Sequence, residues 1–94
     1  HILRLIRRGE VISVASLHEI EAEAIELVAG KDARVLGHPL GKMKFPKDAL
    51  VGAIVRDGEV IMPSGHDEIH AGDRVVVFCL PQAVGNVEKL FASR

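Results

Sequence analysis

Cysteine and aromatic residues are scarce in this sequence. Cys79 is the only cysteine among 94 residues, Trp and Tyr are absent, and there are three Phe. A single cysteine has no mate for an internal disulfide, which favours a reducing, intracellular compartment. Its place among valines indicates a small buried hydrophobic residue and not a reactive thiol. Without Trp or Tyr, the chain lacks the usual stacking platforms for single-stranded nucleic acid.

The chain also lacks an excess of charge of one sign and any long hydrophobic run. Twelve Lys and Arg stand against thirteen Asp and Glu, a formal net charge of −1. This balance supplies no long-range attraction toward phosphate polymers or anionic lipid, so we do not expect nucleic acid as a partner. No apolar stretch approaches the roughly 20 residues of a membrane span, and the first residues lack the hydrophobic centre of a signal peptide.

Length and composition are those of one globular domain. Ninety-four residues, 48% of them apolar, suffice for a single core and are too few for two. The chain begins at His1, without an initiator methionine and inside a segment with a helical pattern. We interpret it as a piece of a longer protein.

Helical spacing of apolar residues occurs at both ends of the chain. Residues 1–9 are predicted as the end of a linker helix that Gly9 terminates, ahead of a domain at 10–94. A second helix is predicted to begin near Pro81. Its apolar stripe consists of Val84, Val87, Leu90 and Phe91. Gly85 weakens this helix by about 1 kcal/mol relative to alanine, so the helix depends on docking.

Strand patterns occupy much of the remainder. Residues 10–17 alternate and are rich in β-branched side chains, which predicts a strand. Residues 49–56 and 59–62 flank Asp57-Gly58, a hairpin signal because glycine accepts the positive φ of a tight turn. Residues 73–80 are predicted as the last strand, and its continuous apolar, β-branched run suits cover on both faces.

Two further segments have helical features. Over residues 19–29, the Ala, Glu and Leu residues favour a helix, whereas alternate apolar residues from Ile25 onward favour a strand. The pattern therefore leaves both a helix and a strand open for this segment. Residues 37–44 precede Pro46 and suit one or two helical turns.

Patterns that would support catalysis or metal binding are weak. His66 and His70 are four residues apart, a spacing that on a helix brings both imidazoles to one zinc ion. They lie in a segment of loop composition, where that geometry is not enforced, so we predict a solvated loop and no metal site. No serine has the setting of a strand-to-helix elbow, and no Gly-x-Gly-x-x-Gly follows a strand. We therefore predict no enzymatic activity.

Several stretches, in order along the chain, carry a resemblance to a known family. They are Leu5-Ile6-Arg7-Arg8-Gly9-Glu10-Val11, Ala22-Glu23-Ala24-Ile25-Glu26, Ile54-Val55-Arg56-Asp57-Gly58-Glu59-Val60-Ile61-Met62-Pro63, Ala71-Gly72-Asp73-Arg74-Val75 and Val87-Glu88-Lys89-Leu90-Phe91. With these motifs the chain resembles the TrkA C-terminal domain family. These are regulatory domains of Trk-type bacterial potassium uptake, within the wider RCK group that regulates potassium conductance.

The resemblance implies an α+β fold with a mixed, largely antiparallel sheet, a short internal helix matching Gly37 to Met43, and a C-terminal helix. For Ala22 to Ala29 it implies a strand. It also implies pairing of copies into a homodimer or higher homo-oligomer. Such pairing would explain an apolar last strand, although a helix covering one face would serve as well.

The resemblance further implies a division of labour. An N-terminal half, absent from this sequence, would bind an NAD- or ATP-type nucleotide. This non-catalytic C-terminal half would assemble subunits and pass the signal to a membrane potassium transporter, in the cytoplasm at the cytosolic face of the inner membrane. In some relatives the paired domains bind a cyclic dinucleotide at their interface. The positions implied for that ligand here are Arg56, Met62 and Pro63, with Arg56 as a phosphate contact.

Overall fold

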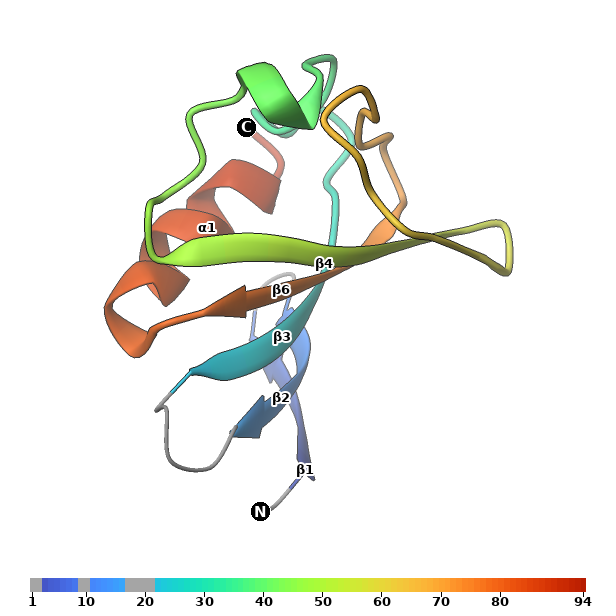
Figure 1. Ribbon diagram of the computed structural model, residues 1–94. Helices are drawn as coiled ribbons and strands as arrows, with labels where there is room; N and C mark the ends of the chain where they lie inside the picture. Colours follow the sequence, from blue (N-terminus) through green and yellow to red (C-terminus); the bar gives the residue numbers. More distant parts are fainter. Residues whose placement is uncertain (1–2, 9–10, 17–21) are drawn as a thin grey trace.

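One antiparallel sheet organises the chain. The computed structural model describes residues 3–8, 11–16 and 22–94, with side chains from residue 22 onward (Figure 1). The strands are β1 Leu3–Arg8, β2 Val11–Ser16, β3 Glu23–Val28, β4 Ala49–Arg56, β5 Glu59–Ile61 and β6 Arg74–Cys79. They lie in the order β1-β2-β3-β6-β4-β5, and each neighbouring pair is antiparallel. The predicted α+β class with a largely antiparallel sheet is confirmed.

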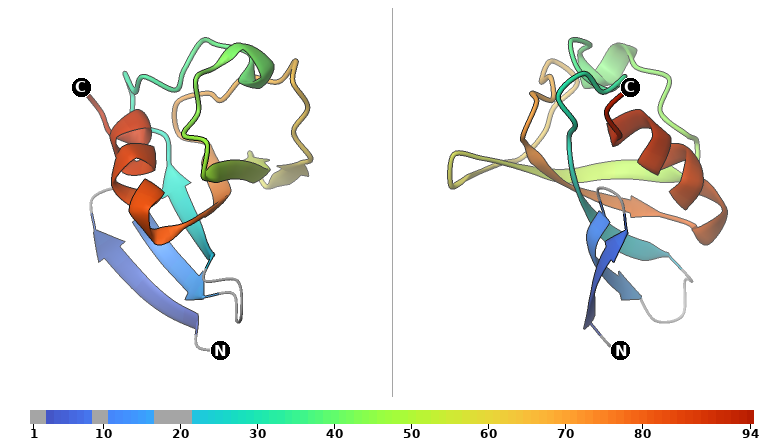
Figure 2. Two further views of the ribbon diagram at one scale, coloured as in Figure 1. Left: turned by 60° about the vertical axis from the view of Figure 1, so that its left-hand side comes forward. Right: turned by 180° about the vertical axis from the view of Figure 1, so that it is seen from behind.

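Short helices lie between β3 and β4 and after β6. The predicted helix at 37–44 is a single 3₁₀ turn, η1, at Leu40–Lys42. The predicted C-terminal helix is confirmed as a 3₁₀ turn, η2 at Pro81–Ala83, that continues into α1 at Val84–Phe91. Figure 2 shows α1 lying across one face of the sheet. No helix in the described part of the chain has the length and apolar character needed to cross a bilayer.

The N-terminal segment differs from its prediction. The pattern predicts a helix over residues 1–9, but Leu3–Arg8 is the strand β1, paired with β2. The helix prediction is wrong because so short a segment distinguishes the two periodicities poorly, and pairing with β2 satisfies its backbone hydrogen bonds. The strand predicted at 10–17 is confirmed over Val11–Ser16, while residues 1–2, 9–10 and 17 lie outside the described residues.

The strand at Ala22 to Ala29 and the Asp-Gly hairpin are confirmed. β3 pairs with β2 on one side and with β6 on the other, and this tertiary pairing outweighs the helix propensity of its Ala and Glu residues. In the hairpin, Asp57 has φ 51° and Gly58 has φ 79°. Two consecutive residues with positive φ match the twist of antiparallel strands, so this turn fixes the register of β4 and β5.

The core lies between α1 and the inner face of the sheet. Alternate residues of β3 and β6 are buried there, together with residues of β4 and α1: Ile25, Leu27, Val75, Val77, Cys79, Ile54, Val87 and Phe91. Cys79 is 2% exposed, which confirms it as a buried hydrophobic residue. Burial, followed by the charges of Glu23 and Glu88, raises the pKa of its thiol to about 11.

β6 is covered on one face in the single chain. Val75, Val77 and Cys79 point to the core, whereas Phe78, on the outer face, is 38% exposed. Cover of the other face of β6 therefore stays a prediction, which pairing of two chains would fulfil. Among the described residues α1 supplies a single layer, and the outer face of β6 carries the exposed Phe78 and Arg74.

A matched pair of glycine substitutions tests the backbone assignments. Gly58→Ala is expected to lower the free energy of unfolding by about 1–2 kcal/mol, because alanine resists the left-handed conformation that the hairpin turn requires. Gly85→Ala is expected to raise it by up to about 1 kcal/mol, because in α1 a Cβ at this position meets open space. Urea titrations of both variants measure the difference, and changes of the same sign would contradict the assignments.

Candidate functional site

A salt bridge joins the hairpin to the turn before β6. The Asp73 side chain is 3% exposed, and the partly exposed Arg56 donates to it from Nε at 3.0 Å and from Nη2 at 2.8 Å. Arg56 Nη2 also donates to the Glu68 carbonyl at 3.0 Å, and the His70 amide donates to Asp73 Oδ2 at 2.8 Å. Two of the motifs that carry the family resemblance, one around Arg56 and one around Asp73, are thus in direct contact.

The salt bridge governs the ionisation of Asp73. Burial by itself raises the pKa of the carboxyl, but the hydrogen bonds from Arg56 and from the His70 amide outweigh it. The pKa of Asp73 therefore lies below its ordinary value of 3.8. At neutral pH the carboxylate is charged and its charge is compensated by Arg56.

The loop at residues 62–73 holds η1 against the sheet. The Asp67 carboxylate accepts the Ser64 amide at 2.7 Å, which closes a tight turn. From this loop, the Asp67 carbonyl accepts the Leu40 amide and the Gly65 carbonyl accepts the Gly41 amide, both at 2.9 Å. A Cβ at Gly41 would lie 3.1 Å from the Gly65 oxygen, so the close approach of the two segments suits glycine.

A mainly apolar cavity lies where η1, β4 and this loop meet. Its volume is about 280 Å³. The lining residues are Leu40, Gly41, Phe45, Ala49, Leu50, Val51, Pro63, Ser64 and Gly65. Because hydrogen bonds between the loop and η1 fix two of its walls, the cavity is a preformed feature of the fold.

The outer face of the sheet, next to this cavity, exposes large apolar side chains. Leu50 is 67%, Val60 66%, Met62 74% and Phe78 38% exposed. Leu50 and Phe78 are cross-strand partners, and the Phe78 ring lies so close over Gly52 that a Cβ there would overlap it. We call these four residues the apolar face. Leu50 belongs both to the apolar face and to the cavity lining.

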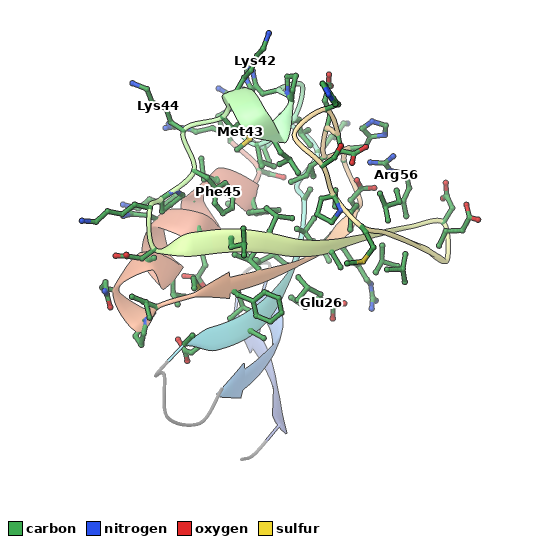
Figure 3. All side chains as sticks on the ribbon, viewed as in Figure 1. Glu26, Lys42, Met43, Lys44, Phe45 and Arg56 are labelled. Carbon is green, nitrogen blue, oxygen red and sulfur yellow. The ribbon has the colours of Figure 1, made fainter. Side chains whose placement is uncertain are left out.

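The three predicted ligand residues have different surroundings in the structure. Pro63 lines the cavity, and Met62 is exposed on the apolar face. Arg56, which Figure 3 labels, lies in the salt bridge, where its Nε and Nη2 donate to Asp73. Its charge is therefore already compensated, and it is placed to hold the fold together more than to meet a phosphate.

The histidine pair lies in a loop, as predicted. His66 is at a turn and His70 precedes the Gly72 turn, and both are exposed. Within the described ranges, no group of three or more His, Cys, Asp or Glu side chains is arranged to hold a metal ion.

Sequence reasoning missed Asp73 and the apolar face. A Gly-Asp pair before a strand signals a turn, but nothing local identifies the partner of the carboxylate, 17 residues away in sequence. Leu50 and Phe78 fit any strand pattern. Whether they face the core or the solvent depends on the register of β4 against β6, which includes an irregularity between Val51 and Ala53.

Comparison with solved structures defines the class of this domain. A chain described as "Structure of RCK domain with cda" superposes with a TM-score of 0.63, covering 72% of this chain and 96% of that one at 22% identity. At this identity the likeness establishes the fold alone, which is that of an RCK domain.

Comparison by sequence places the chain in a family. The model of the TrkA-C domain matches residues 24–92, so the chain belongs to the TrkA-C domain family, as the motifs indicate. Similar curated proteins include Trk system potassium uptake protein TrkA homolog 2 of Methanosarcina mazei, 42% identical over 96% of this chain, and TrkA of Azorhizobium caulinodans, 39% identical over 96%. The chain spans 20% of the length of each relative.

Removal of the Asp73 charge should lower stability and alter its pH dependence. A carboxyl group whose pKa is lower in the folded than in the unfolded state stabilises the fold fully when the pH is above the unfolded-state pKa. This contribution is lost as the pH falls through the folded-state pKa. The free energy of unfolding should therefore decline as pH falls below about 3.8. Asp73→Asn is expected to cost about 1–3 kcal/mol at neutral pH and to flatten that acid decline.

The exposed Asp57 provides the control for this substitution. Asp57→Asn removes a carboxylate one residue from Arg56, and asparagine accepts the positive φ of this position. We expect a change below about 0.5 kcal/mol. Urea titrations across the acid range measure both variants, and equal costs at the two positions would contradict the role of the salt bridge.

Proposed function

We propose that this chain is a non-catalytic regulatory and assembly domain of a Trk-type potassium uptake regulator. Family membership and the names of the curated relatives support the Trk system. In this proposal the remainder of the protein binds an NAD- or ATP-type nucleotide. The domain described here pairs with a second copy and helps to couple that signal to a membrane potassium transporter at the cytosolic face of the membrane.

The apolar face is the observation that carries the assembly part of the proposal. Contiguous exposed apolar residues on a small domain mark interaction surfaces, and these four lie on neighbouring strands β4, β5 and β6 or directly after β5. Charged residues occupy the same side of the sheet nearby. They are Arg74 on β6 and Glu26 on β3, which Figure 3 labels. An apolar centre with a polar rim is the usual anatomy of a protein interface.

A second copy of the chain is the occupant that fits this face. The surface is self-complementary in character, since apolar side chains at the centre of one copy meet the same side chains of the other across a two-fold axis. Pairing also covers the outer side of β6, whose apolar run suits burial on both faces. The resulting dimer brings the two cavities at Leu50 toward the same interface.

Introduction of a charge on the apolar face tests the assembly proposal. Leu50→Glu is expected to weaken dimerisation at least about tenfold, because burial of one leucine contributes about 1.5–3 kcal/mol. Asn86→Glu adds the same charge at an exposed position of α1 and should leave dimerisation unchanged. Sedimentation equilibrium measures both dissociation constants. A wild-type chain that stays monomeric at high micromolar concentration would contradict assembly through this domain.

A second candidate function is small-ligand sensing at the interface, and the cavity favours it. Its volume, about 280 Å³, lies just below the usual range of small-ligand pockets, about 300–1,000 Å³, so it suits one base of a cyclic dinucleotide. The remainder of such a ligand would lie on the apolar face, between Leu50 and Met62. The ligand's own two-fold symmetry matches that of a dimer with two cavities.

A thermal-shift experiment tests ligand sensing. A cyclic diadenylate or diguanylate present at about 100 times its dissociation constant stabilises the folded state by about 2.7 kcal/mol. In a domain of this size, that raises Tm by roughly 10–20 °C. Ala49→Leu narrows the cavity and should abolish the shift. Ala71→Leu adds the same atoms at an exposed turn away from the cavity and should preserve it. No shift with either nucleotide would remove this function.

A further inference from the structure

Positive charge is concentrated in one segment of a chain that is nearly neutral overall. Residues 31–47 contain five of the twelve Lys and Arg but one of the thirteen Asp and Glu. The local field there differs in sign from the net charge of −1. A small anion would sense this local field over a Debye length of about 8–10 Å.

The structure places three of these five cations, Arg34, Lys42 and Lys44, around a concave site. Its volume is about 280 Å³ and it is lined by Arg34, His38, Lys42, Met43, Lys44 and Leu90. We call it the basic site. In Figure 3, Lys42 and Lys44 extend away from the body of the domain, whereas Met43 between them turns inward. Met43 and Leu90 pack against the core and form an apolar floor.

Among the described residues, no acidic side chain pairs with the cations that line the basic site. In the described part of the chain the salt bridge between side chains is that of Arg56 with Asp73, and it involves none of the lining cations. No acidic residue lines the site. The one acid in the segment, Asp32, accepts the Arg94 amide at 2.7 Å, and its carbonyl accepts Arg94 Nε at 3.0 Å. A cluster of cations without counter-charges raises the local concentration of anions.

The backbone that carries these cations is held at several points. The Val35 amide, next to Arg34, donates to the Leu90 carbonyl at 3.0 Å. The Lys42 amide donates to the Pro39 carbonyl at 2.9 Å, and the Leu40 amide donates to the loop that carries Asp67. Both walls of the site are thus anchored to other elements, which reduces the entropy lost when a ligand binds.

We propose that the basic site binds the phosphate groups of a small phosphorylated ligand. The Arg34 guanidinium provides a planar pair of donors that suits phosphate oxygens, and Lys42 and Lys44 add point charges. His38 adds a further nitrogen at the rim, and the floor of Met43 and Leu90 contacts the part of the ligand next to the phosphate. The site includes Leu90 of α1, on the side of the sheet opposite the apolar face, so it does not depend on the proposed assembly.

Titration with inorganic pyrophosphate at low ionic strength, followed by amide chemical shifts of the whole chain, tests the proposal. Shifts are expected for residues 34–38 and 42–44 and not for the hairpin turn at 57–58. Lys42→Gln and Lys44→Gln should each weaken binding by about two- to fivefold, the range for a single exposed charge pair. Lys47→Gln removes a lysine from the same segment without altering the lining, and it should change the affinity less than either.

A further variant separates geometry from charge. Arg34→Lys retains the charge but loses the planar pair of donors, so binding of pyrophosphate should weaken although the net charge is unchanged. The proposal would be overturned if Arg34→Lys left the affinity for pyrophosphate unchanged and Lys42→Gln and Lys47→Gln lowered it equally. Those results would indicate diffuse electrostatic attraction of the anion and no defined site. All the substituted side chains are exposed, so we expect each variant to fold. The amide spectrum of each variant checks this.

Vesicles distinguish the two sources of such a phosphate. Phosphatidylcholine vesicles with and without phosphatidylglycerol are sedimented with the chain and with the same variants. Pyrophosphate binding without vesicle binding supports a soluble ligand, and binding to phosphatidylglycerol vesicles that Lys42→Gln weakens supports a lipid headgroup. Absence of both pyrophosphate binding and vesicle binding overturns the proposal.

Discussion

The sheet has apolar residues on two faces, and among the described residues one α-helix, α1, covers one of these faces. α1 is eight residues long, and it closes the inner face through Val87 and Phe91, both completely buried. Phe78 and Leu50 on the outer face receive no such layer from the described residues. Since exposed apolar area is costly in water, this imbalance is the physical reason behind the proposed pairing of two copies.

The Arg56–Asp73 salt bridge connects this architecture to the cavity. It ties the hairpin to the turn before β6, and between the two runs the loop whose carbonyls hold η1. The loop whose carbonyls accept the η1 amides beside the cavity is therefore anchored next to this salt bridge.

Local energetics explain which elements were predictable. The Asp57-Gly58 turn follows from the φ that each residue accepts, and the helix after Pro81 follows from a fixed φ and a regular apolar stripe. At the N-terminus the same reasoning predicts a helix where β1 forms. Its pairing with β2 is a contact between segments, and such contacts outweigh local propensity in a short element. In the candidate site, Pro63 was predicted and lies in the cavity, whereas Asp73 and Leu50 were not.

By itself, the sequence determined the turn chemistry, most strands and the family, because these depend on composition and on neighbours along the chain. The tertiary structure decided which apolar residues face water, because that depends on the register between β4 and β6. It also decided that Arg56 meets Asp73 and that Arg34 lies with Lys42 and Lys44 around one concavity. Charges that are far apart in sequence act together only where the fold brings them close in space, and local sequence patterns do not specify that proximity.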